Sequence, residues 1–329
     1  MSTVQVQQVA STPGNPKDLP TREDIERAHK LIAEAVHRTP VMSSRYINSL
    51  VGAEIYFKCE HLQAGGAFKY RGASHVMRLL TDAEKERGVI THSSGNHAQA
   101  VALSAKRFGI KATIVMPKGS NPLKKRATKG YGAKLIECEN SQASREQTCA
   151  EEIERTGMVL IHPFDDHRII CGAGTAALEL AEEVPDLDMV ITPVGGGGLL
   201  SGTSTALHKR MPVYGSEPMG ADDAYRGFTS GTRVSEQTPN TIADGLRTCV
   251  GVRNFEIIRQ RVTGIGLTND TEILEATSLI HLRMKQLIEP SSAVPLACLL
   301  NGSIPKAPKI GIIISGGNVD LKDLMSRMP

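Results

Sequence analysis

Apolar residues near the start of the chain follow a helical spacing. Within residues 21–36 (TREDIERAHKLIAEAV) they recur every three or four positions, which places one set on a single helical face: Ile25, Ala28, Ile32 and Ala35. Thr21 precedes this face, and Asp24 follows three residues later in a variant of the capping box that marks a helix start. The pattern predicts a helix over 21–36.

The rest of the chain alternates between short apolar runs and segments with helical spacing. The apolar runs predict strands at 53–60, 88–94, 111–117, 133–138, 158–164, 188–194, 212–218 and 309–317. The segments between them predict helices at 96–109, 121–132, 144–157, 171–184 and 199–210. Strands that alternate with helices are typical of parallel sheets, whose ligands bind at the carboxyl ends of the strands. The predicted fold class is therefore α/β.

One part of this alternation is long enough to form a unit of its own. Residues 84–161 contain a complete β-α-β-α-β-α run. We predict that they form a small domain inserted into a large domain, which would comprise residues 18–83 and 162–329. Residues 1–17 are mostly polar, so we expect a flexible N-terminal tail.

Composition narrows the function without identifying it. The chain has 329 residues, of which 40% are hydrophobic and 22% charged, and its formal net charge is +3. These values describe an ordinary globular protein. The one dense basic segment, residues 118–130, contains no aromatic residue, which favours a solvated helix face over nucleic-acid binding. No apolar run approaches a membrane span, and the N-terminus lacks a signal-peptide pattern.

Cysteines and histidines show no metal-binding or disulfide pattern. Ten histidines show no HExxH or similar spacing. The six cysteines form no CxxC pair and have mostly apolar neighbours, so we expect reduced, buried thiols in a cytoplasmic protein: Cys59, Cys138, Cys149, Cys171, Cys249 and Cys298.

A lysine lies among small residues in residues 65–73 (GGAFKYRGA). Two interpretations of Lys69 are open. Either it lies in a surface turn with its charge in water, or it is partly buried, easily deprotonated and reacts as an amine. This stretch alone favours the surface turn, so the choice depends on the rest of the chain.

Four consecutive glycines follow a predicted strand and precede a predicted helix in DMVITPVGGGGLLSG. Gly195 to Gly198 can adopt positive φ angles and expose backbone N–H groups, because no Cβ interferes. Such N–H groups, together with the N-terminus of the next helix, form a phosphate site. The run is neither a P-loop, since no GK[ST] follows, nor a GxGxxG motif with a later acidic residue. A phosphate cradle is favoured over a plain tight turn.

A phosphate cradle and a reactive lysine together suggest pyridoxal 5′-phosphate (PLP), which enzymes hold through a Schiff base and through its phosphate. Six motifs occur in this order: GAFKYRGA, THSSGNHAQA, PVGGGGLLSG, EPMGADDA, NTIADGL and ISGGNVDL. In these motifs the chain resembles the fold type II (tryptophan-synthase-β-like) PLP enzymes. It is most similar to the branch that holds serine racemases, serine/threonine dehydratases and 3-hydroxyaspartate dehydratases.

The resemblance implies the fold and the cofactor contacts. The large domain would be an open, twisted, mostly parallel sheet, with the small α/β domain inserted. Lys69 would form the Schiff base (aldimine) with PLP, Phe68 would pack against the ring, and Asn96 would bind the ring hydroxyl. Ser315 would face the pyridine nitrogen, and Gly245 belongs to the same set. The phosphate would be bound by the N–H groups of Gly195, Gly196, Gly197, Gly198 and Leu199.

The resemblance also implies a second acid/base and a substrate site. Lys69 and Ser94 would lie on opposite faces of the substrate, a minimal pair for racemisation, although a helix N-cap is the alternative for Ser94. The N–H groups of the turn 93–97 would bind the substrate carboxylate. Arg145 would pair with a carboxylate, unless it is a solvated helix arginine. The implied substrate-binding set is Ser93, Ser94, Asn96, His97, Arg145 and Thr248.

Two acidic residues match a divalent-cation site of this branch. Glu217 and Asp223 lie in SEPMGADD with Ala221 between them. Two carboxylates and the Ala221 carbonyl, completed by waters, suit Mg²⁺, Mn²⁺ or Ca²⁺. The alternative is a pair of exposed acids after a strand.

The predicted function is a PLP-dependent serine racemase that also has L-serine dehydratase (ammonia-lyase) activity. The main alternative is a 3-hydroxyaspartate dehydratase, in which Arg145 holds the extra carboxylate; Ala67, which precedes Phe68, weakens a threonine dehydratase assignment. A remote alternative is a nucleotide-binding oxidoreductase or a ligand-sensing module that uses the glycine run. The family further implies a homodimer and leaves ATP open as an effector.

Overall fold

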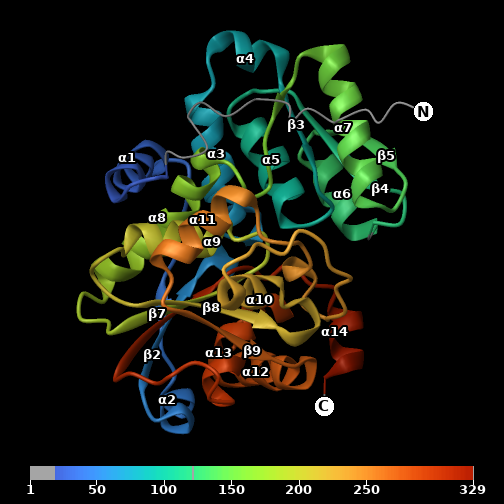
Figure 1. Ribbon diagram of the computed structural model, residues 1–329. Helices are drawn as coiled ribbons and strands as arrows, with labels where there is room; N and C mark the ends of the chain where they lie inside the picture. The colour runs from blue at the N-terminus through green and yellow to red at the C-terminus, as the bar shows by residue number, and fades with distance from the viewer. Residues whose placement is uncertain (1–18, 121, 329) are drawn as a thin grey trace.

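The strands of the computed structural model, which describes residues 19–120 and 122–328, form two separate sheets (Figure 1). The larger sheet lies in the lower part of Figure 1, and the smaller one lies with its helices at the upper right. The predicted flexible tail, residues 1–17, is outside the described residues. Within the described residues, no helix is long and apolar enough to cross a membrane.

The larger sheet has six strands in the order β1-β2-β10-β7-β8-β9. Neighbouring strands run parallel, except that β1 and β2 are antiparallel. This arrangement confirms the predicted α/β class with a mostly parallel sheet. The strands are β1 (Val41–Met42), β2 (Glu54–Cys59), β7 (Met189–Pro193), β8 (Val213–Pro218), β9 (Gly264–Thr268) and β10 (Lys309–Ile314).

Helices cover both faces of this sheet, and the side chains of its central strand β10 pack against both layers. Because side chains alternate along a strand, Ile312 and Ile313 enter different cores. Ile312 packs in a core with α2, α12 and α13, whereas Ile313 packs in one with α1, α8 and α9. These helices are α1 (Arg22–Ile32), α2 (Arg45–Val51), α8 (His167–Glu183), α9 (Gly198–Ala206), α12 (Asp270–Met284) and α13 (Val294–Leu300).

The smaller sheet has four parallel strands in the order β5-β4-β3-β6. All of its strands fall between residues 84 and 161, but that this segment forms an independent inserted domain stays a prediction. We call the sheet and its helices the four-stranded unit. It comprises β3 (Val89–His92), α5 (Asn96–Arg107), β4 (Ala112–Pro117), α6 (Pro122–Gly130), β5 (Lys134–Cys138), α7 (Gln142–Thr156) and β6 (Val159–Leu160).

The remaining helices connect the two sheets or cover their edges. They are α3 (Lys69–Leu79), α4 (Asp82–Arg87), α10 (Asp223–Ser230), α11 (Val252–Arg261) and α14 (Leu321–Arg327). Helix α3 packs closely on α8, since a Cβ on Gly172 would lie 2.6 Å from the Gly72 Cα. Two such glycines allow the helix backbones to approach closely, which fixes α3 against the core.

Most predicted elements are present, with shifted ends. The helix predicted over 21–36 has its Thr21–Asp24 capping box and a buried Ile25, but it ends at Ile32. The strand predicted at 158–164 is reduced to two residues, since Pro163 lacks the N–H that a ladder needs. Strand β9 and helix α12 were not predicted. All six cysteines are free, and all but the half-buried Cys249 are buried, as expected.

A buried network of four charges connects β2, α3 and α8. Lys58, Glu60, Arg71 and Glu179 are each at most 1% exposed. Arg71 Nε lies 2.7 Å from Glu60 Oε2, and Arg71 Nη2 lies 2.7 Å from Glu179 Oε2. Lys58 Nζ lies 2.6 Å from the same Glu179 oxygen. Burial alone would raise the pKa of Glu179, but the hydrogen bond and charge of Arg71 lower it.

Replacing Arg71 with Met should destabilise the fold strongly, because it leaves two buried carboxylates with one cation. We expect a loss of roughly 3–5 kcal/mol in the free energy of unfolding, measured by urea denaturation. Arg38→Ala, which removes an ion pair to Glu182 with both side chains about half exposed, should cost about 1 kcal/mol or less. Equal effects of the two substitutions would contradict this account of the network.

Candidate active site

Lys69 begins α3 and directs its amine into the protein. Its Nζ donates a hydrogen bond to the Pro163 carbonyl at 2.7 Å and lies 5.2 Å from the centroid of the Phe68 ring. Burial lowers the pKa of Lys69 to about 8, although the nearby Glu289 carboxylate opposes the shift. At this pKa a useful fraction of the amine is neutral near pH 7, and the neutral amine is the nucleophile. The interpretation of Lys69 as a surface-turn charge is therefore wrong.

Asn96, at the start of α5, joins the four-stranded unit to the larger sheet. Its amide nitrogen donates to both oxygens of Glu289, at 2.9 and 3.1 Å, and its oxygen accepts from Asn318 Nδ2 at 3.0 Å. Burial raises the pKa of Glu289 to about 7, and repulsion by Asp244 adds to the shift. The sequence analysis missed Glu289 as a site residue, since no local pattern distinguishes it from an exposed acid.

The predicted glycine run connects β7 to α9 and presents unused backbone donors. Within the described residues, none of the N–H groups from Gly195 to Leu199 donates a hydrogen bond, and Ser201 is the first of α9 to donate, to Gly197 O. Gly197 has a φ of +90°, which favours glycine. Five adjacent free N–H groups at a helix N-terminus form a site for an anion such as a phosphate.

Two residues that the sequence analysis missed fix this run in place. A Cβ on Gly196 would lie 2.2 Å from Cγ of the Phe164 ring, so the ring packs directly on the glycine. Asn254 Nδ2 donates to Gly196 O at 2.8 Å and to Phe164 O at 3.0 Å. Neither residue belongs to a recognisable motif, so only the folded chain identifies them. Gly245 also adjoins the run: its carbonyl would lie 2.9 Å from a Cβ on Gly195.

Ser315 directly follows β10 and is hydrogen-bonded through its backbone to Phe68, the residue before Lys69. Its carbonyl accepts a hydrogen bond from the Phe68 N–H at 3.0 Å, which places Phe68 and Lys69 at the carboxyl end of the strand. Ser315 is 5% exposed, and its hydroxyl oxygen lies 3.0 Å from Ser292 Oγ. A hydroxyl, and no carboxylate, is therefore available from this position.

The start of α5 offers a hydroxyl and several free N–H groups. The N-cap residue is Gly95, so the N-cap alternative for Ser94 is wrong. Among the described residues the Ser94 hydroxyl forms no hydrogen bond, and the N–H groups of Ser94, Asn96 and His97 have no acceptor. One expectation needs correction: the Ser93 N–H donates to Val115 O at 3.1 Å in the sheet ladder, so it is not free for a carboxylate.

His97 is held neutral behind this turn. Its Nε2 lies 3.1 Å from the Ile161 carbonyl, which makes Nε2 the donor, and its buried Nδ1 has no partner among the described residues. Burial lowers the pKa of His97 well below its ordinary value, and the charge of Lys69 adds to the shift. His97 is therefore a neutral imidazole whose Nδ1 keeps a free lone pair.

Arg145 and Thr248 are less clearly placed. Arg145 is half-buried in the first turn of α7 and donates from Nε to Ser141 O at 3.4 Å. Burial lowers the pKa of His92 to about 4, with smaller contributions from His162 and Arg145, so the arginine lies within electrostatic reach of the residue before Ser93. Thr248 is exposed, and its side chain forms no hydrogen bond within the described part of the chain.

Comparisons with known proteins identify the family. A family profile described as pyridoxal-phosphate dependent enzyme matches residues 32–316. The chain belongs to this family. The serine racemase of Dictyostelium discoideum is 46% identical over 92% of this chain and 96% of its own length. The beta-hydroxyaspartate dehydratase of Paracoccus denitrificans is 43% identical over 93% of this chain and 98% of its own length.

Solved structures agree with this family and with the predicted fold. The structure of maize serine racemase has a TM-score of 0.91 and 42% identity, and the match covers 94% of this chain and 97% of that chain. The predicted fold type II PLP enzyme is thereby confirmed. The comparisons favour a PLP enzyme over the remote alternative of a nucleotide-binding oxidoreductase or ligand-sensing module.

The residues present fit PLP. The N–H groups of Gly195–Leu199 are free to bind an anion, and the Phe164 ring packs on Gly196 of the same run. Lys69 lies between Phe68 and Phe164, with its Nζ 6.0 Å from the Phe164 centroid. An aldehyde bearing an aromatic ring and a phosphate matches this set of an amine, two aromatic side chains and an anion cradle.

The two acids expected at a cation site of this PLP enzyme are buried. Glu217 is 0% and Asp223 2% exposed, so the interpretation as exposed acids is wrong. Glu217 accepts from the N–H groups of Ala224 and Tyr225, and Asp223 accepts from Gln237 and Val250. Burial raises the pKa of both carboxyls, that of Asp223 to about 6. The described residues contain no group of three or more His, Cys, Asp or Glu arranged for a metal.

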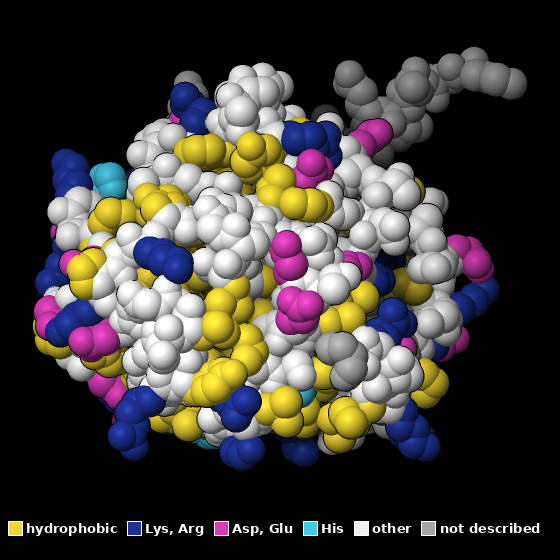
Figure 2. All heavy atoms as spheres, turned by 90° about the horizontal axis from the view of Figure 1, so that it is seen from below, with side chains coloured by type: hydrophobic (Ala, Val, Ile, Leu, Met, Phe, Trp, Pro, Cys, Tyr) yellow, Lys and Arg dark blue, Asp and Glu magenta, His cyan; other side chains and the backbone are white. Residues whose placement is uncertain are grey.

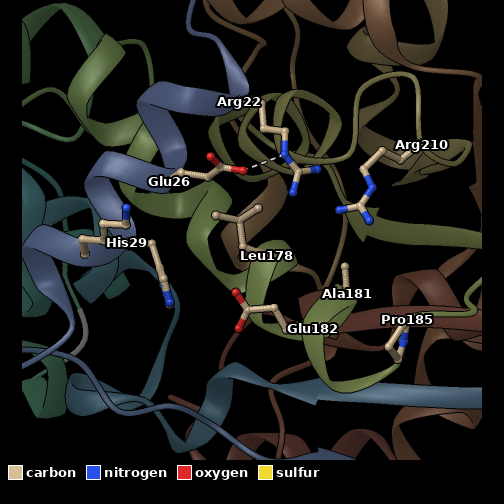
Figure 3. Close-up of a pocket in the computed structure, with 9 residues that line it drawn as sticks. Arg22, Glu26, His29, Leu178, Ala181, Glu182, Pro185 and Arg210 are labelled. Carbon is tan, nitrogen blue, oxygen red and sulfur yellow. Dashed lines mark hydrogen bonds and ion pairs between the residues drawn. The ribbon is translucent and has the colours of Figure 1, made fainter.

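A separate cavity of about 400 Å³ lies between α1, α8 and the loop after α9 (Figure 3). Arg22, Glu26 and Arg210 point toward it, and Arg22 forms an ion pair with Glu26. None of the residues that line it belongs to the candidate PLP site. The amine and the glycine run, rather than this cavity, form the candidate active site.

Replacing Gly196 with Ala should weaken PLP binding, because the new methyl group overlaps the Phe164 ring and displaces the cradle. We expect the dissociation constant to rise at least roughly tenfold, measured by titrating PLP into cofactor-free protein and following visible absorbance. Gly130→Ala in α6 is the control, since a Cβ there meets nothing within 4 Å. If both variants bind PLP as tightly as the parent, Gly196 does not belong to the phosphate site.

Proposed function

We propose that the protein is a PLP-dependent serine racemase that also eliminates water and ammonia from L-serine. The observation that carries the proposal is the half-buried Lys69, whose amine donates to the Pro163 carbonyl near a glycine run whose five N–H groups are free. Support comes from the similarity, above 40% identity over nearly the whole chain, to a serine racemase and to a hydroxyaspartate dehydratase.

The chain supplies the groups that racemisation requires. When bound, PLP supplies an electron sink for the substrate carbanion. Lys69, whose pKa is about 8, removes the α-proton from one face, and the Ser94 hydroxyl delivers a proton on the other. The free N–H groups of Asn96 and His97 bind and orient the substrate carboxylate. The half-buried Phe164 ring and the neutral His97 limit water and competing charge around the amine.

Elimination follows from the same groups when reprotonation is slow. Ser315, whose hydroxyl lies 3.0 Å from Ser292 Oγ, would face the ring nitrogen of the cofactor, and a hydroxyl there would hold a proton on that nitrogen less firmly than a carboxylate would. The electron sink is then weaker, and loss of the β-hydroxyl competes with reprotonation by Ser94. The free N–H groups of Gly195–Leu199 would hold the cofactor phosphate, which would supply an acid for the departing hydroxyl.

A 3-hydroxyaspartate dehydratase is the second candidate. It is supported by the 43% identity to the Paracoccus denitrificans enzyme and by Arg145, which is half-buried on α7 near His92. A guanidinium at this position pairs with the additional carboxylate of such a substrate. The ratio of kcat/KM for L-serine to that for L-threo-3-hydroxyaspartate separates the two candidates.

A divalent cation is proposed between Glu217 and Asp223. Each carboxylate oxygen accepts one hydrogen bond and keeps a lone pair, and neither residue forms an ion pair within the described residues. The carbonyl of the buried Ala221 accepts no hydrogen bond from described residues and would be the third ligand. Oxygen ligands of this kind suit Mg²⁺, Mn²⁺ or Ca²⁺, which would fix the loop before α10.

A homodimer is proposed through an apolar patch on the lower face of the molecule, where Figure 2 shows hydrophobic side chains gathered between Lys and Arg side chains. The large apolar residues concerned lie on α2, α12 and nearby turns and are 45–60% exposed: Tyr46, Leu50, Leu62, Leu282 and Leu287. Exposed apolar area of this extent favours burial against a second copy. The cytoplasmic location and the ATP effector stay predictions.

Replacing Ser94 with Ala should remove racemisation and leave elimination, because Lys69 alone removes the α-proton from L-serine. We expect D-serine formation to fall by roughly 10²-fold or more, with pyruvate formation from L-serine within about threefold of the parent. Chiral chromatography and a pyruvate assay measure the two products. A parallel loss of both activities would show that Ser94 is not the second acid/base.

Adding a divalent cation should stabilise the protein, because it neutralises two buried carboxylates that repel each other. At pH 7.5 we expect the melting temperature with millimolar Mg²⁺ or Ca²⁺ to exceed that in EDTA by about 2–6 °C. The Asp223→Asn variant, which keeps one of its two acceptor oxygens but loses the charge, should lose this difference. An equal shift in the variant would place the cation elsewhere.

A further inference from the structure

An ion pair crosses the gap between the four-stranded unit and the larger sheet. Lys124 of α6 places its Nζ 2.6 Å from Oδ2 of Asp244, which begins the short helix Asp244–Leu246. The Lys124 side chain is 19% exposed and that of Asp244 43%. The two residues are 120 positions apart in the chain, so the contact depends on how the two parts are placed relative to each other.

Each end of this ion pair is attached to a different half of the candidate site. Helix α6 packs against α5, whose first turn carries Asn96 and follows Ser94. Asp244 precedes Gly245, whose N–H donates to Ser291 Oγ at 3.0 Å and whose carbonyl adjoins Gly195. The pair therefore joins the substrate-binding turn to the loop that supports the cofactor cradle.

Polar residues outnumber apolar ones around this ion pair. A cavity of about 290 Å³ lies beside the ion pair, lined by Lys124, Asp244, Arg247, Asn318 and residues of α14. The polar contacts near the candidate site are those of Asn96 with Glu289 and with Asn318, whereas elsewhere α5 packs on α3 in a shared apolar core. Because polar contacts rather than a packed core join the parts here, breaking one of them changes how often the gap opens.

We propose that Lys124 is a positioning residue, which acts through Asp244 to keep the Ser94–His97 turn closed over Lys69. The inference rests on the proposed function, because it assumes that substrate binds between this turn and the amine. Opening the gap moves Ser94 and the free N–H groups of Asn96 and His97 away from the amine. Substrate binding then has to close the gap first, which raises KM.

Lys125 provides a matched control on the same helix. Its side chain is also 19% exposed, and its Nζ also lies 2.6 Å from a carboxylate, that of Glu137. Glu137 belongs to β5, so this pair lies entirely within the four-stranded unit. Removing either lysine deletes one positive charge from α6, and only removal of Lys124 breaks a contact across the gap.

The experiment compares Lys124→Met, Lys125→Met and Lys124→Arg in the PLP-bound protein. For Lys124→Met we expect KM for L-serine to rise roughly two- to fivefold, which is the range for a partly exposed ion pair, and kcat to change by less than about twofold. The KM of Lys125→Met should match that of the parent. The KM of Lys124→Arg should lie close to that of the parent, because arginine keeps the positive charge. In the parent, added NaCl should raise KM toward the Lys124→Met value.

Hydrogen exchange provides a readout that does not depend on turnover. Backbone amides of residues 94–97 should exchange roughly two- to fivefold faster in Lys124→Met than in the parent or in Lys125→Met. Equal exchange and equal KM in the two methionine variants would overturn the inference while leaving the proposed function intact. Faster exchange with unchanged KM would also overturn it, since closure would then not serve substrate binding. If no β-hydroxy amino acid is turned over, the proposed function fails, and exchange alone decides whether Lys124 closes the gap.

Discussion

The guanidinium of Arg71, held between Glu60 and Glu179 without exposed surface, is the interaction on which the site depends. Buried charges stabilise a fold only as a complete set, because a single unpaired member costs several kcal/mol. Here the complete set fixes the first turn of α3 to β2 and α8. Lys69 lies two residues before Arg71, so the position of the amine follows from this network.

The two sheets supply different parts of the chemistry. The part of the chain with the larger sheet provides the amine at the start of α3, beside the end of β10, the cradle after β7 and the Ser315 hydroxyl after β10. The four-stranded unit provides the N-terminus of α5, with its free N–H groups and the Ser94 hydroxyl. Since β2, β7 and β10 are neighbours in one parallel sheet, their carboxyl ends meet and bring distant segments together. The reactive space lies where both units contribute, with Asn96 in contact with Glu289.

Features encoded over short distances were predictable from the sequence. The Thr21–Asp24 capping box, the strand–glycine–helix unit at 195–198 and the parallel α/β class all follow from local spacing. Motif order added the family and the PLP assignment, which the family profile over residues 32–316 bears out. Strand β9 was missed because its GIGLT sequence is short and interrupted by glycine.

Features that depend on which strands become neighbours were not predictable. No spacing rule places Glu289 beside Asn96 or Phe164 on Gly196, because these contacts arise from strand order and from the placement of the four-stranded unit. The availability of N–H groups is also hidden in the sequence: Ser93 was expected to bind substrate through its N–H, but the sheet ladder uses that donor. The burial of Glu217 likewise appears only once β8 is enclosed by its neighbours.

Borohydride reduction of the protein with added PLP, followed by peptide mapping, tests the central claim most directly. If Lys69 is the amine that binds the cofactor, the protein becomes yellow on addition of PLP, borohydride bleaches it, and the modified peptide carries the label on Lys69. A protein that stays colourless, or a label that falls on another lysine such as Lys58, would contradict the account.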